Sequence, residues 1–193
     1  MPRALVLFAH PCPESFSAAL HQTVVEALSD RWEVDDFDLN AEGFNPVLTE
    51  AERRGYHEEP ANIEPVREHV ERVRAAKALV LVFPVWNFGY PAILKGFFDR
   101  VFLPGVSFEL VDGKVQPNLQ NIRRLAAVTT YGGTRTRAFL AGDPPRHVVK
   151  RHLRYVCHPH APVRYLALYD MNRATAADRS AFLERVRAQM LAF

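Results

Sequence analysis

The sequence predicts an α/β fold in which helices cover both faces of a five-stranded parallel sheet. Short apolar runs alternate along the chain with segments whose apolar residues recur every three or four positions. Strands that alternate with helices in this way pair in parallel through right-handed crossovers. The chain has 193 residues, of which 48% are hydrophobic and 24% charged. This is an average globular composition, and we expect one domain spanning residues 1–193.

Five segments have the pattern of strands. Residues 4–9 form a continuous apolar run, which is typical of a strand buried on both faces, and residues 78–83 are the most apolar of all. Residues 33–39 are more polar, so we place them at an edge of the sheet. The other two strands are expected at 125–130 and 163–169. An apolar centre beside a polar second strand predicts the strand order 2-1-3-4-5.

The first three helices follow from periodicity and capping. Residues 16–28 place an apolar side chain at every fourth position, and residues 66–73 give a second amphipathic helix with Asn62 as its expected N-cap. Residues 91–102 form a third helix, because proline suits its first turn and one face is broadly apolar.

A hairpin and two further helices complete the pattern. Residues 108–115 contain the Asp-Gly pair of a tight hairpin turn. Residues 144–157 are expected to be helical. The closing helix covers 175–191, where Thr175 and Asp178 have the spacing of a capping box.

The charge is unevenly distributed although the net charge is only +2. Residues 26–72 contain 14 acids and 5 bases, whereas residues 123–154 contain 8 bases and the single acid Asp143. These stretches are either solvated faces of opposite sign or, for the basic one, a surface that attracts an anionic small molecule. No zinc-finger spacing, RNA-binding motif or long basic run is present, so we expect no nucleic-acid partner.

The composition also indicates a compartment. The longest clean apolar runs are about six residues, far short of the ~20 that a transmembrane helix needs, so we expect no transmembrane segment. The N-terminal segment shows no small-residue cleavage site. Two cysteines, Cys12 and Cys157, make no disulfide framework. We therefore expect a cytoplasmic protein.

Three loops are selected by the predicted topology. In such a sheet, ligands bind outside the carboxyl ends of the strands, near the switch point between the first and third strands. The loops at that edge are residues 10–17, 84–90 and 130–137.

The first loop has the composition of an anion site. It opens a helix, whose N-terminal amides and dipole attract a negative group, and His10, Ser15 and Ser17 add donors. Alternatively, Ser15 only caps the helix and His10 is an ordinary loop histidine. No Gly-x-Gly-x-x-Gly or Gly-Lys-Ser/Thr motif occurs, which disfavours a dinucleotide-binding Rossmann turn and a P-loop.

The second and third loops suit a planar ligand. Trp86, Phe88 and Tyr90 place three aromatics within five residues, which fits stacking on a heterocycle, although a hydrophobic plug or a dimer interface would also explain them. The paired Gly132 and Gly133 let the backbone approach a ligand closely, unless they only form a turn. Together the three loops describe a phosphate end, an aromatic slot and an amide-lined ring edge, the shape of a flavin mononucleotide portion.

No metal site is expected. The run Cys157-His158-Pro159-His160 contains three ligand types, but adjacent residues rarely point at one ion, and no second cluster accompanies it. A hydrolase triad is also disfavoured, because neither a Ser-His-Asp order nor a Gly-x-Ser-x-Gly elbow is present.

Residues 83–102 resemble the signature of the flavodoxin-like NAD(P)H:quinone oxidoreductases. This family includes the DT-diaphorase type, the bacterial drug-activity modulators and the ancillary subunits of glutathione-gated potassium efflux systems. The run Pro-Ala-Ile-Leu-Lys-Gly at 91–96 is long and specific. The resemblance covers essentially the whole chain, because three further features match in order and spacing: His10, Ser15-Phe16, and Thr129-Thr130 with Gly132-Gly133.

The resemblance implies a flavodoxin-like three-layer fold, a tightly bound flavin and a homodimer with active sites at the subunit interface. It also implies a cofactor site. By position, the flavin phosphate would be held by His10, Ser15, Phe16, Ser17 and Ala18; the isoalloxazine would be flanked by Pro84, Val85, Trp86, Asn87 and Phe88; and its pyrimidine edge would face Thr130, Tyr131, Gly132 and Gly133. Thr129 is also expected in the cofactor site.

The implied activity is two-electron transfer of hydride from NAD(P)H through the flavin to a quinone or similar acceptor. FAD is the expected cofactor, with FMN as the alternative. The sequence departs from the family after the glycine pair, where no equivalents of its proton-handling Tyr and His are found, so the catalytic residue is unknown. Tyr131, which splits the usual Thr-Thr-Gly-Gly, and the basic Arg135 and Arg137 are the candidates.

Two other functions remain open at this point. One is a flavodoxin-like electron carrier, although such carriers tend to be strongly acidic and this chain has a net charge of +2. The other is a regulatory or ancillary flavoprotein subunit of a membrane transporter.

Overall fold

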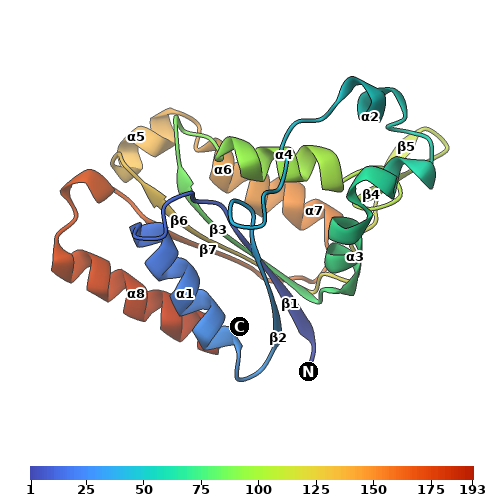
Figure 1. Ribbon diagram of the computed structural model, residues 1–193. Coiled ribbons are helices and arrows are strands. Elements are labelled where there is room, and N and C mark those ends of the chain that lie inside the picture. The colour runs from blue at the N-terminus through green and yellow to red at the C-terminus, as the bar shows by residue number, and fades with distance from the viewer.

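The computed structural model describes residues 1–193, and a five-stranded parallel sheet with the order β2-β1-β3-β6-β7 forms its centre (Figure 1). The strands are β1 (Arg3–Phe8), β2 (Glu33–Asp38), β3 (Ala78–Val85), β6 (Arg124–Tyr131) and β7 (Val163–Leu168). A separate antiparallel hairpin supplies β4 (Phe108–Val111) and β5 (Lys114–Pro117). Counting only the strands of the large sheet, the predicted order 2-1-3-4-5 is confirmed.

Helices cover both faces of the sheet (Figure 1). On one face, α1 (Phe16–Leu28) and α8 (Ala176–Leu191) pack over a cluster of 18 buried residues. On the other face, a cluster of 29 buried residues lies beneath α3 (Arg67–Ala75), α4 (Ala92–Val101) and the segment 144–156. Because both faces of the central strands are buried, those strands read as continuous apolar runs. No helix combines the length and the apolar composition needed to cross a bilayer.

Two local predictions are confirmed in atomic detail. At the start of α8, the Thr175 hydroxyl accepts from the Asp178 amide (3.2 Å) and the Asp178 carboxylate accepts from the Thr175 amide (2.8 Å), which completes the capping box. In the β4–β5 hairpin, Asp112 and Gly113 adopt φ values of 50° and 73°. Both are left-handed, as a tight hairpin turn requires.

The prediction that Asn62 caps the second helix is wrong. Residues Ala61–Val66 form a 3₁₀-helix, η1, and α3 begins only at Arg67 without a side-chain cap. The Asn62 amide instead donates to the carbonyls of Tyr56 (3.1 Å) and Pro104 (3.0 Å). Pro65 lies inside this segment, lacks an N–H and disfavours α-helical geometry in the residue before it, so the regular helix starts after it.

The helical segment 144–157 is broken into three parts. Two short α-helices, α6 (Pro144–His147) and α7 (Arg154–Val156), flank a π-helical turn, η2 (Val148–Leu153). Three short elements were not predicted from the sequence: α2 (Glu50–Arg54), α5 (Arg135–Leu140) and the 3₁₀-turn η3 (Met171–Arg173). Two of these three, α5 and η3, bear on the site described below.

Candidate functional site

The three loops selected from the sequence meet at one edge of the sheet. They follow β1, β3 and β6, which are adjacent parallel strands, so their carboxyl ends lie side by side. A pocket of about 300 Å³ opens between the second and third loops. We call it the edge pocket, and it is lined by Val85, Asn87, Phe88, Tyr131, Gly132, Gly133, Arg137 and Asn172.

The first loop presents hydrogen-bond donors that no protein group uses. Ser15 is the N-cap of α1, and its hydroxyl accepts from the Ala18 amide (3.1 Å). The amides of Phe16 and Ser17 donate to no acceptor in the chain, as expected for a helix N-terminus. The N-terminus of this 13-residue helix is therefore equipped to bind an anion.

His10 adds a donor beside this helix. Its Nδ1 accepts from the Cys12 amide (3.0 Å), which leaves the proton of a neutral ring on Nε2. The ring also contacts Trp86 of the second loop edge to face, with 5.6 Å between ring centroids. His10 thus connects the first loop to the second.

The second loop is a tight and strained turn. Trp86 and Gly89 exchange two backbone hydrogen bonds (3.2 and 2.8 Å), and the two residues between them, Asn87 and Phe88, have φ values of 48° and 57°. A left-handed conformation costs a residue other than glycine about 1 kcal/mol or more. The side chains of Trp86 and Phe88 lie at the surface of this turn, with 44% and 42% of each residue exposed. The amides of Asn87 and Phe88 have no acceptor in the chain.

The third loop brings bare backbone to the pocket. Neither Gly132 nor Gly133 is left-handed, so the missing side chain is what matters here. A Cβ on Gly132 would lie 3.3 Å from Nδ2 of Asn172, which is tighter than an ordinary contact. Both glycine amides lack an acceptor, while the Gly133 carbonyl accepts from the Asp170 amide (2.8 Å).

The Tyr131 hydroxyl is held by protein groups, although its sequence position suggested a residue at the edge of the flavin ring. Part of it lines the edge pocket, but its hydroxyl donates to the Asp143 carboxylate (2.5 Å) and is 2.6 Å from the Tyr165 hydroxyl. Its ring also stacks on Tyr169, with centroids 4.6 Å apart. Burial raises the pKa of Tyr131 far above its ordinary value, and Tyr165 and Asp143 raise it further. The phenol is therefore a neutral donor held in a buried network.

No motif or periodicity in the sequence predicted this network. Its only signal in the sequence was Asp143, the single acid in a basic stretch. In the structure Asp143 is 9% exposed, and its backbone is left-handed (φ 42°). Asn172 was also missed, because nothing in the run around it distinguishes it from a surface residue.

The two arginine candidates point to different places. Arg137 lines the edge pocket, whereas Arg135 lines a separate cavity with Arg146 and Tyr169. The unpredicted helix α5 explains this separation, because residues two positions apart on a helix do not share a face.

The remaining predicted residues lie beneath the loops. Pro84 is buried in β3 opposite Thr130 of β6. Thr129 is fully buried, and its hydroxyl has no hydrogen-bond partner. Ala18 lies in the first turn of α1, where its amide binds the Ser15 hydroxyl. Their part in binding stays a prediction.

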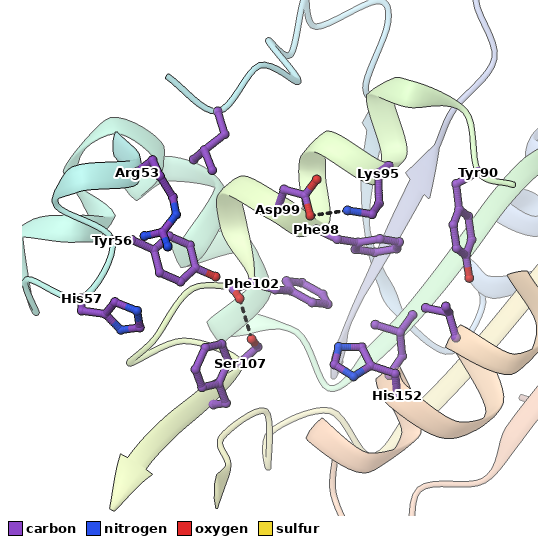
Figure 2. Close-up of a pocket in the computed structure, with 14 residues that line it drawn as sticks. Arg53, Tyr56, His57, Tyr90, Lys95, Phe98, Asp99, Phe102, Ser107 and His152 are labelled. Atoms are coloured by element: carbon purple, nitrogen blue, oxygen red, sulfur yellow. Dashed lines mark hydrogen bonds and ion pairs between the residues drawn. The ribbon is translucent and has the colours of Figure 1, made fainter. Parts of the chain in front are cut away.

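The largest cavity, about 560 Å³, lies elsewhere, beside α4 (Figure 2). We call it the α4 cavity; α2, α4, the β4 strand and η2 contribute to it. Figure 2 shows Phe98 of α4 and Phe102, the residue after that helix, on one side and His152 of η2 on another. The Lys95–Asp99 pair (2.5 Å) lies at the cavity, as does Ser107, whose hydroxyl donates to the Phe102 carbonyl (2.8 Å). The lining is mostly apolar and aromatic.

Comparison with known proteins agrees with this architecture. Residues 2–191 match the model of a family described by its flavodoxin-like fold. Smu.1420 from Streptococcus mutans is 28% identical and superposes with a TM-score of 0.85 over 99% of this chain and 100% of that one.

Two curated rat enzymes are also similar to this chain. NAD(P)H dehydrogenase [quinone] 1 is 32% identical over 147 residues, which are 67% of this chain and 54% of the enzyme, so the chain matches only about half of that protein's length. Ribosyldihydronicotinamide dehydrogenase [quinone] is 30% identical over 161 residues, or 73% of this chain and 69% of the enzyme. The chain belongs to the flavodoxin-like family that includes the NAD(P)H:quinone oxidoreductases.

Proposed function

We propose that this protein is a flavin-dependent NAD(P)H:quinone oxidoreductase. One observation carries the proposal: three loops at the carboxyl edge of the sheet leave six backbone amides without acceptors, and four of them, from the second and third loops, belong to residues that line a pocket of about 300 Å³. Unpaired donors of this number need a partner, and water or a polar ligand can supply it. The names of the two rat relatives support a quinone as the acceptor.

The donors fit the two polar ends of a flavin. The amides of Phe16 and Ser17, together with Nε2 of His10, suit a phosphate. The amides of Asn87, Phe88, Gly132 and Gly133 suit the oxygens and nitrogens at the edge of the ring system. We propose the 15 residues named from the resemblance as the cofactor site, with FAD as the cofactor and FMN as the alternative.

A bound flavin would supply the redox chemistry, accepting a hydride from NAD(P)H and passing it to the quinone. The chain's own residues contribute orientation and charge. Trp86 and Phe88 offer exposed aromatic surface on which planar rings stack. The glycine amides and the Arg137 guanidinium place positive charge at one edge of the pocket, where it stabilises negative charge on the reduced ring.

We also propose a homodimer formed through the face that contains the α4 cavity. The hairpin beside this cavity exposes Leu110, Val111 and Val115 by 48–50% each, and a two-stranded hairpin is marginally stable alone. Phe108 of the same hairpin lines the cavity. A second copy would cover this apolar surface and bring two sites together.

The visible spectrum of the purified protein is the first test of the flavin. We expect absorption near the flavin bands, release of FAD on denaturation, and steady oxidation of NAD(P)H with menadione as acceptor. A colourless protein that fails to take up added FAD or FMN would overturn the proposal.

Sedimentation at micromolar concentration tests the dimer. We expect a dimer that dissociates when Phe108 and Leu110 are replaced by Glu. A monomer with full turnover would refute a site shared between subunits while leaving the flavin proposal intact.

A further inference from the structure

A third cavity, of about 240 Å³, lies along the edge strand β7, and arginines are its only charged side chains. We call it the arginine cavity. Separate elements supply its side chains: α5, α6, α8 and β7 with the residue after it. Its lining consists of Arg135, Arg146, Arg185, Tyr165, Ala167 and Tyr169.

None of its three arginines has a carboxylate within ion-pair distance. Seven of the chain's 20 arginines form ion pairs, and these three are among the 13 that do not. Arg146 lies over the Tyr165 ring (5.1 Å from guanidinium carbon to centroid) and makes a long hydrogen bond of 3.4 Å to the Tyr169 hydroxyl. The nearby Asp143 carboxylate accepts from Tyr131 and is not part of the lining.

Three guanidinium groups around one small space repel one another. A bound anion would relieve this repulsion. Guanidinium groups bind the oxygens of phosphate in pairs, and the Tyr169 hydroxyl, which accepts from Arg146, keeps its own proton to donate. A volume of about 240 Å³ suits a phosphate group and not a whole nucleotide, which needs a larger pocket.

The arginine cavity lies next to the edge pocket. Tyr131 lines the edge pocket, and its ring stacks on Tyr169, which lines the arginine cavity. Arg135 begins α5 directly after the glycine loop. The stacked rings of Tyr131 and Tyr169 therefore separate the two spaces.

We infer that Arg135, Arg146 and Arg185 form a binding site for a dianionic phosphate monoester. One source of this group is the extra phosphate that distinguishes NADPH from NADH, and that assignment rests on the proposed function. The other source is a free phosphate or a separate phosphorylated ligand. The chemistry recognised by the cavity is the same in both cases.

Thermal unfolding of the purified protein, at constant ionic strength, tests the site without any activity measurement. Inorganic phosphate, AMP and adenosine 2′,5′-bisphosphate should each raise the Tm saturably, whereas adenosine, which carries no phosphate, should not. Arg185→Gln and Arg146→Gln should weaken this response at least tenfold. Arg151→Gln removes an equal charge from an exposed position outside the cavity and should leave the response unchanged.

Thermal unfolding without added phosphate shows whether Arg185 binds an anion or only stabilises the fold. Because the three charges repel one another, Arg185→Gln should melt at the same temperature as the parent protein or higher when no anion is added. A lower Tm in that buffer, or equal phosphate responses in Arg185→Gln and Arg151→Gln, would overturn the inference.

Steady-state kinetics then identifies the source of the phosphate. If the group belongs to NADPH, Arg185→Gln should raise the KM for NADPH several-fold and leave the KM for NADH and for the quinone unchanged. If the group belongs to a free ligand, Arg185→Gln should lose the rise in Tm with phosphate, while its KM values for NADPH and NADH stay the same as those of the parent protein. A protein without NAD(P)H turnover would refute the proposed function, and the melts alone would still decide the site.

Discussion

Two arginines of the N-terminal half, Arg72 and Arg100, are paired with carboxylates of the chain, whereas the three arginines of the arginine cavity are not. Arg72 binds Asp35 and Glu42 (2.7 Å each) and lies 3.9 Å from the centre of the Phe37 ring. Arg100 binds Glu52 and the Asn45 carbonyl. By contrast, the arginine cavity contains three guanidinium groups that have no carboxylate partner.

This difference separates charges that hold the fold from charges that are available to a ligand. A guanidinium that is 16% exposed and paired on two sides fixes the edge strand β2 to α3. An unpaired guanidinium in a cavity contributes little to folding and much to the local potential. Substitutions in the two regions should therefore affect different measurements.

The largest effect is expected from Arg72→Met. This change leaves the Asp35 carboxylate, whose side chain is 18% exposed, without its partner. Breaking such a pair should cost about 2–3 kcal/mol of the free energy of unfolding and lower the Tm by about 5–10 °C. The double variant Arg72→Met with Asp35→Asn should recover part of the loss in urea unfolding. A Tm within 1 °C or so of the parent protein would contradict a structural role for this pair.

Tyr131→Phe should have the next largest effect on stability. The buried Asp143 carboxylate would lose its hydroxyl donor, which costs about 1–3 kcal/mol. Because that hydroxyl is engaged in the network with Asp143 and Tyr165, turnover per bound flavin should change less than twofold. A much larger fall in kcat, with the fold intact by circular dichroism, would instead make Tyr131 a catalytic residue.

Gly132→Val tests the unpaired backbone amides of the third loop. Its side chain would press on Asn172 and move the loop away from a bound ring, so flavin affinity should fall about tenfold, or about 1.4 kcal/mol. The Tm of the flavin-free protein should change little. Gly55→Val is the matched control, since its Cβ meets only ordinary contacts at 3.6 Å or more. Equal flavin affinity in both variants would remove the third loop from the site.

The smallest effect concerns the pH dependence of stability. Burial raises the pKa of Glu52, but hydrogen bonds from Thr49 and Arg100 outweigh this and hold the pKa below its ordinary value. A lowered folded-state pKa stabilises the protein above the unfolded-state value and is lost as the pH falls through the folded-state value. Between pH 5 and pH 3, the Tm of Glu52→Gln should therefore fall slightly less than that of the parent protein. A steeper fall in the variant would contradict the assignment.

Local patterns identified the strands, the main helices and the three loops. Runs such as residues 4–9 and 78–83 are apolar because both faces of those strands are buried, and a capping box such as that of Thr175 involves neighbours only three residues apart. The predicted helix boundaries were wrong where a proline or a change of helix type interrupted the apolar periodicity. Pro65 delayed the start of α3, and the broad helical segment 144–157 contains a π-helical turn.

The sequence by itself determined the strand order and which three loops share an edge, since parallel strands joined by right-handed crossovers leave few alternatives. Only the tertiary structure decided which side chains converge there. The Tyr131–Asp143–Tyr165 network and the arginine cavity each join residues from separate elements. Arg135 and Arg137 were grouped by their nearness in sequence, but α5 directs them to different cavities. Such contacts depend on how elements pack, and no periodicity along the chain records them.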